Sequence, residues 1–129
     1  MSELALNSAV AFQKALELNL DVVVPDDYTL QVDIDSPDVP ENFNGLLHLL
    51  QINFSVGPVY YEKSRNGNTH ITIKLLEPMN ATERILLQAA LGSDGKRELL
   101  SFKRFKLGDP VPTLFFEKKE VEDASTSAE

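Results

Sequence analysis

The 129-residue chain has no cysteine and no tryptophan, and it has only six glycines. The absence of cysteine excludes disulfide bonds, a thiolate zinc site and a cysteine nucleophile. No apolar run approaches the roughly 20 residues that cross a membrane, and the N-terminus lacks a basic segment followed by an apolar stretch. We therefore expect a cytoplasmic protein with no membrane partner, whose hydrophobic residues (43%) build a single core.

Positive charge is scarce at both ends of the chain. Residues 1–62 contain one lysine and ten acids, residues 63–106 contain nine Lys or Arg and four acids, and residues 107–129 contain two lysines and six acids. The net charge of −8 by itself argues against a nucleic-acid partner, because phosphate backbones are bound through clustered Lys and Arg. The basic middle segment leaves such a partner open, although the same residues could form ordinary solvated helix faces.

Periodicity predicts one α+β domain over residues 1–117. Helices are expected over residues 3–19 and 41–56, after Asn80 with a capping box to Glu83, and after Asp94. Strands are expected over residues 28–35, 59–63, 69–76 and 112–117, with Gly57-Pro58 ending the second helix. The economical arrangement is an RRM-like or ferredoxin-like, four-stranded, mostly antiparallel sheet with helices on one face. The acidic tail, residues 118–129, is expected to be disordered.

Asp33 and Asp35 are the first candidate for chemistry. They lie two residues apart on a predicted strand, so their carboxylates leave the same face about 7 Å apart. Such a pair can share Mg²⁺ or Mn²⁺, with water and substrate phosphate oxygens completing the coordination. Turn chemistry before Ser36-Pro37 is the other explanation for acids at this place.

The second candidate is the end of the predicted hairpin, Ser64–His70. His70, Thr72 and Lys74 alternate with apolar residues, so we expect their side chains on the exposed sheet face together with the two aspartates. A histidine there could bind a phosphate oxygen or act as an acid, or it could be an ordinary exposed strand histidine. His48 lies in a helical apolar run and is interpreted as structural or surface.

These two elements resemble motifs of a known family. Val32-Asp33-Ile34-Asp35 resembles the hydrophobic-Asp-hydrophobic-Asp first motif of the archaeo-eukaryotic primase (primase-polymerase) superfamily, and Ser64–His70 is similar to the second. The resemblance spans residues 28–117 and implies a metal-dependent nucleotidyltransferase with an RRM-like catalytic half. It implies that Asp33 and Asp35 bind Mg²⁺ or Mn²⁺ and that His70 contacts the phosphates of the incoming nucleotide. It also implies a reduced member that works on nucleotides or DNA, encoded by a mobile element or phage.

The chain departs from that family in three respects. Asn68 stands where the family usually has serine, two residues before the histidine. The best candidate for the third metal-binding acid is Asp94, which is also a predicted N-cap, while Asp109 and Glu117 are weaker candidates. Only one helix precedes the first strand, so the additional α/β unit of a full primase is not expected. A non-catalytic module that binds nucleotide or nucleic acid through the same face, and a plain interaction protein, therefore stay open.

Basic residues follow the predicted motifs along the chain. Lys or Arg beside metal-bound phosphates would offset charge and follow a nucleic-acid backbone. The residues predicted to bind nucleotide or nucleic acid are Ser64, Arg65, Thr72, Lys74, Lys96, Arg97, Lys103 and Arg104. Gly92-Ser93-Asp94-Gly95 lacks the Lys-Ser/Thr ending of a Walker loop, so a P-loop is not predicted.

Overall fold

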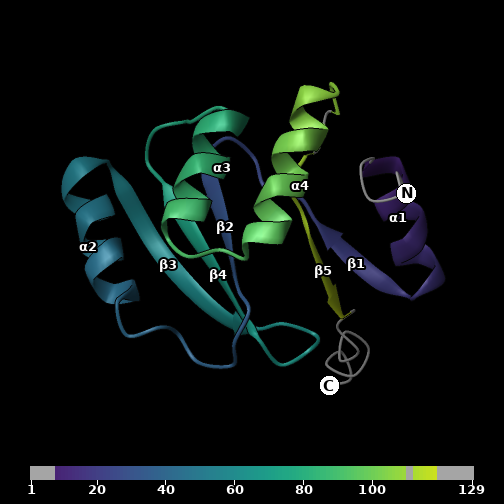
Figure 1. Cartoon of the computed structure of the whole chain (residues 1–129), viewed down its shortest axis with the longest axis horizontal. Coiled ribbons are helices and arrows are strands. Elements are labelled where there is room, and N and C mark those ends of the chain that lie inside the picture. The colour runs from purple at the N-terminus through teal and green to yellow at the C-terminus, as the bar shows by residue number, and fades with distance from the viewer. Residues whose placement is uncertain (1–7, 110–111, 119–129) are drawn as a thin grey trace, which may run out of the picture.

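The computed structural model of the protein describes residues 8–109 and 112–118 (Figure 1). Its elements are α1 (Ser8–Glu17), β1 (Leu20–Val23), β2 (Thr29–Ile34), α2 (Phe43–Asn53), β3 (Val56–Lys63), β4 (Thr69–Leu75), α3 (Ala81–Ala90), α4 (Gly95–Lys106) and β5 (Phe115–Lys118). The predicted α+β class is confirmed. No helix in the described ranges is long and apolar enough to cross a membrane. The predicted disorder of the acidic tail, residues 118–129, is wrong at Lys118, which is the last residue of β5, and residues 119–129 lie outside the described residues.

The sheet that carries the aspartates has three antiparallel strands in the order β2-β4-β3. Its β3–β4 hairpin is confirmed, and Gly67 adopts a φ of 87° in the turn, a conformation that glycine reaches without steric cost. β4 is the central strand, and its register places His70 directly opposite Asp33 of β2 and Glu62 of β3. The hairpin therefore brings the two candidate elements of the sequence side by side.

One face of this sheet carries the hydrophobic core. Alternate residues of β2 and β4 are almost fully buried there, and α2 and α3 cover them. The core consists of Leu30, Val32, Ile34, Phe43, Leu47, Leu50, Ile71, Ile73, Leu75 and Leu91. Because side chains alternate across a strand, burial of this set forces Gln31, Asp33 and His70 onto the opposite face.

The predicted four-stranded sheet is wrong in its last strand. The fourth strand was expected over residues 112–117, but β5 pairs antiparallel with β1, a short strand that the sequence did not predict. Figure 1 shows this β1–β5 ribbon beside β2 and α4, apart from the main sheet. The outer edge of β2, where a fourth strand would pair, is instead filled by side chains and backbone from α3, α4 and the turn between them.

The contacts along this edge replace strand pairing. The Gln31 N–H donates to Gln88 Oε1 (2.9 Å), and the Gln31 carbonyl accepts from Arg97 Nη1 (2.8 Å). The Asp33 N–H donates to Ser93 Oγ (2.9 Å), and the Asp33 carbonyl accepts from the Asp94 N–H (2.7 Å). Every outward-facing peptide group of these two residues is therefore satisfied without a partner strand, as buried backbone requires.

Glu98 joins these edge contacts into one network. Its carboxylate accepts hydrogen bonds from Gln88 Nε2 (3.0 Å), Ser93 Oγ (2.6 Å) and Arg97 Nη1 (2.6 Å). Glu98 is 3% exposed and Gln88 is fully buried, so the network lies inside the protein. A buried carboxylate is tolerated here because a paired cation and two neutral donors compensate its lost hydration.

The local sequence signals for the helices have mixed outcomes. The capping box of Asn80 and Glu83 is confirmed, and Asp94 caps α4 by accepting from the Lys96 N–H. The prediction that Gly57-Pro58 ends a helix is wrong, because α2 stops at Asn53 and both residues lie inside β3. A register irregularity between Val56 and Val59 accommodates the proline, which cannot donate to the ladder.

We expect Gln88→Ala to lower the free energy of unfolding by about 1 to 3 kcal/mol, because it leaves the buried Gln31 N–H without a partner and removes one of the three donors to the Glu98 carboxylate. Denaturant unfolding of the variant measures this loss. Gln51→Ala is the matched control, since Gln51 is an exposed glutamine on α2. Equal stability of the Gln88 variant and the control would show that the edge network does not support the fold.

Candidate functional site

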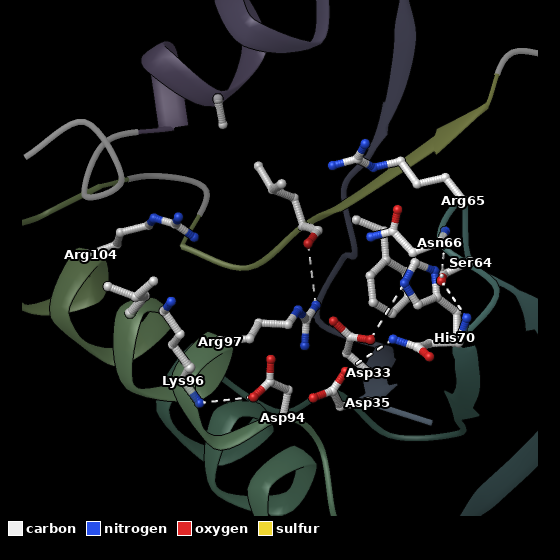
Figure 2. Close-up of a pocket in the computed structure, with 15 residues that line it drawn as sticks. Asp33, Asp35, Ser64, Arg65, Asn66, His70, Asp94, Lys96, Arg97 and Arg104 are labelled. Atoms are coloured by element: carbon white, nitrogen blue, oxygen red, sulfur yellow. Dashed lines mark hydrogen bonds and ion pairs between the residues drawn. The ribbon is translucent and has the colours of Figure 1, made fainter. Parts of the chain in front are cut away.

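A cavity of about 380 Å³ opens where the polar face of β2 and β4 meets α4 and the β1–β5 ribbon (Figure 2). The hairpin turn, the start of α4 and one residue of α1 complete its wall. The lining residues are Ala11, Asp33, Asp35, Ser64, Arg65, Asn66, Asn68, His70, Asp94, Lys96, Arg97, Leu100, Arg104, Leu114 and Phe115. Most of the site residues predicted from the sequence thus line one hollow.

Some of the predicted binding residues lie elsewhere. Thr72, Lys74 and Lys103 are not in the wall of this cavity. The Lys74 ammonium donates to the Thr29 hydroxyl (3.1 Å) at the far end of β2, and Lys103 lies on the exposed side of α4. Any contact between these three residues and nucleic acid would have to extend beyond the cavity.

Three carboxylates lie at the base of the cavity. Asp33 and Asp35 come from the end of β2, and Asp94 comes from the turn before α4 (Figure 2). Burial raises the pKa of Asp33, the positive charge of Arg97 opposes this shift, and the negative charges of Asp94 and Asp35 add to it. The acids are therefore close enough to repel one another, and a shared cation would relieve that repulsion.

His70 departs from its predicted exposure. The sequence placed it on an open face, but it is only 7% exposed, because the Phe115 ring of β5 stacks on the imidazole with centroids 3.7 Å apart and planes 4° apart. His70 Nε2 lies 3.6 Å from Asp33 Oδ1, at the inner end of the cavity. The prediction of an exposed strand histidine is thus wrong, since the ribbon covers the sheet at this point.

This environment fixes the charge of His70. Burial lowers the pKa of the imidazole to about 4, and the nearby positive charge of Arg97 acts in the same direction. The ring is therefore neutral at physiological pH and can serve as a hydrogen-bond donor or acceptor, but not as a cation for phosphate or as an acid near pH 7.

Two arginines of the cavity also hold the segment that precedes β5. Arg97 Nη2 donates to the Leu114 carbonyl (3.3 Å), and its guanidinium lies 4.6 Å from the centre of the Phe115 ring. Arg104 Nη1 donates to the Pro112 carbonyl (3.1 Å). Arg97 is thus bound to β2, to Glu98 and to the β5 segment together, so its first role is to assemble the cavity wall.

The hairpin turn contributes the other side of the cavity. The Ser64 hydroxyl accepts from the Asn68 N–H (3.0 Å), and the Asn68 side chain donates to Asp35 Oδ1 (3.0 Å). Asn68 therefore orients one of the two strand carboxylates. The turn also carries Arg65, whose guanidinium points toward the cavity in Figure 2, across from Arg104.

The donor set fits a divalent cation that is completed by a ligand. Among the described residues, no three His, Cys, Asp or Glu side chains are grouped to hold a metal ion by themselves. Mg²⁺ is commonly bound through one or two carboxylates, with waters and substrate phosphates in the other positions. Asp33 and Asp35 match that pattern, whereas Asp94 already accepts the Lys96 N–H as the cap of α4.

Several residues of the site had no signal in the sequence. Phe115 read as part of a strand, and nothing local indicated that its ring would lie on His70. The buried partners Gln88 and Glu98 occupy ordinary helix positions. A buried Glu beside Arg97 becomes recognisable only when the packing of α3 against α4 is known.

Comparison of the chain with models of protein families, with curated proteins and with solved structures finds no match.

We expect the depressed pKa of His70 to make the fold less stable as pH falls from about 6.5 to about 4. In this range the unfolded chain binds a proton that the folded protein excludes, so the free energy of unfolding rises with pH. His70→Gln should remove this contribution, which is on the order of 2 to 3 kcal/mol. Denaturant unfolding at several pH values measures it.

The control for this measurement is His48→Gln, because His48 is exposed on α2. The control variant should keep the wild-type slope between pH 4 and 6.5. If His70→Gln also keeps that slope, then His70 is not held neutral by its burial.

Proposed function

We propose that the protein is a small primase-polymerase-like domain that binds a nucleotide with Mg²⁺ or Mn²⁺ in this cavity. The observation that carries the proposal is that Asp33 on β2, Asp35 one residue beyond its end and His70 on β4 line one cavity, which Arg65 and Lys96 also line. A site for a nucleoside triphosphate needs carboxylates that hold the metal ion and cations that bind the phosphates. A neutral imidazole can add a hydrogen bond.

The residues of the chain have separable parts in this function. Asp33 and Asp35 would hold the metal ion, which supplies charge neutralisation and polarisation of the phosphoryl group when bound. Lys96 and Arg65 would bind phosphate oxygens, one from α4 and the other from the hairpin turn. His70 would act as a neutral hydrogen-bond donor. The Phe115 ring stacked on the imidazole, and Asp33 beside Nε2, would hold the ring in one orientation.

The fold supports the family relation in part. β2, β4 and β3 with α2 and α3 correspond to the sheet and the helices that an RRM-like half would contain. The β1–β5 ribbon does not occupy the place of the fourth strand. The proposed family relation therefore concerns β2, β3 and β4, whereas β5 contributes Phe115 to the wall of the cavity.

A non-catalytic nucleotide- or nucleic-acid-binding module is the second candidate. The donor set favours it, because no third His, Cys, Asp or Glu of the described residues is grouped with Asp33 and Asp35 to hold a metal ion. In that case the cavity would bind phosphates without transferring a nucleotidyl group. Incorporation of a labelled nucleotide into a primed DNA template in the presence of Mn²⁺ separates the two, since only the primase-like domain extends the primer.

We expect Asp33→Asn/Asp35→Asn to weaken Mn²⁺-dependent binding of a nucleoside triphosphate at least tenfold, because the pair supplies the charge that the metal ion needs. Isothermal titration of the triphosphate with and without Mn²⁺ measures this. Asp38→Asn is the control, since Asp38 is an exposed acid just beyond β2. An unchanged, Mn²⁺-dependent affinity in the double variant would contradict the proposed site.

A further inference from the structure

The cavity has an apolar wall that the proposed metal and phosphate chemistry does not use. Leu100, Leu114 and Ala11 line it, from α4, from the segment before β5 and from α1. All three are partly exposed, so their side chains present carbon to the hollow instead of filling a core. A ligand made of phosphate alone would gain nothing from this surface.

The spacing along α4 places this apolar surface between charges. Lys96, Leu100 and Arg104 are four residues apart, so they lie on one face of the helix, each about 6 Å further along its axis. The Lys96 N–H donates to the Asp94 carboxylate (3.1 Å), so this residue lies at the carboxylate end of α4. An extended ligand whose phosphates lie at Lys96 would therefore cross Leu100 next.

We propose, resting on the function proposed above, that the cavity binds a mononucleotide with its phosphates at Lys96 and Arg65 and its nucleoside against Leu100, Leu114 and Ala11. A nucleoside has apolar ring faces and carries no charge, whereas its phosphates are anionic, so the apolar wall and the cations Lys96 and Arg65 match the two parts of the ligand. Leu100 and Leu114 are then specificity-determining residues, because they distinguish a nucleotide from inorganic polyphosphate.

The size of the cavity supports a single small ligand. Its volume of about 380 Å³ is near the lower end of the range of roughly 300 to 1,000 Å³ that is usual for small-molecule sites. Duplex nucleic acid could not enter such a hollow.

The test compares a nucleoside triphosphate with inorganic tripolyphosphate on the full chain with Mn²⁺. We expect the nucleoside triphosphate to bind at least tenfold more tightly. Leu100→Asn and, separately, Leu114→Asn should bring the two affinities within about threefold of each other while leaving the affinity for tripolyphosphate unchanged. The matched control is Leu99→Asn, because Leu99 is 73% exposed on the outer side of the same helix.

The outcomes separate this inference from the proposed function. Equal affinities of wild-type protein for the two ligands would overturn the nucleoside wall and leave the metal and phosphate site intact. Absence of binding by either ligand would overturn both. Competition by a single-stranded oligonucleotide as strong as that by the nucleoside triphosphate would overturn the assignment to a mononucleotide. Because the first comparison needs no variant, the proposal stays falsifiable even if one substitution prevents folding.

Discussion

The N–H and C=O groups on the outer edge of β2 have no partner strand, so other groups must form hydrogen bonds with them. The positions of α3, α4 and the turn between them depend on this requirement. Arg97, Ser93, Gln88 and the backbone of Asp94 take the place of a partner strand. To do so, α3 and α4 must pack against β2 with the turn between them next to Asp33. The same contact that closes the edge therefore brings the basic face of α4 to the strand carboxylates.

The buried pair of Arg97 and Glu98 explains why the β1–β5 ribbon lies where it does. Once the guanidinium is fixed against β2, its other nitrogen is directed to the Leu114 carbonyl and its face to the Phe115 ring. Phe115 then covers His70 and keeps the imidazole neutral. Replacing one partner of such a pair leaves a buried charge uncompensated, which is more costly than never having buried the pair.

Local chemistry made part of this structure predictable. The Asp-x-Asp strand, the hairpin around Gly67 and the caps of α3 and α4 follow from side-chain alternation, turn preferences and capping, and all of them are present. The carboxylates could be predicted because acids alternate with apolar residues on β2. The cations of α4 could be predicted because Lys and Arg are concentrated in that part of the sequence.

The parts that could not be predicted depend on contacts between distant segments. Nothing within residues 112–117 says whether a short strand joins the main sheet or pairs with β1. Arg97 was predicted to bind nucleotide because Gln31, its partner on β2, is 66 positions away in the sequence. The pairing of Arg97 with its neighbour Glu98 depends on the burial of both side chains, which no sequence pattern indicates. His70 was expected in solvent for the same reason, since Phe115 lies 45 positions further along the chain.

Hydrogen exchange of the Gln31 and Asp33 amides, followed by NMR, tests most directly whether side chains close the β2 edge. Both amides face away from β4, so without the network they would exchange as open edge groups do. The account predicts protection comparable to that of the Ile71 and Ile73 amides in the central strand. Rapid exchange of Gln31 and Asp33 in an otherwise protected sheet would contradict it.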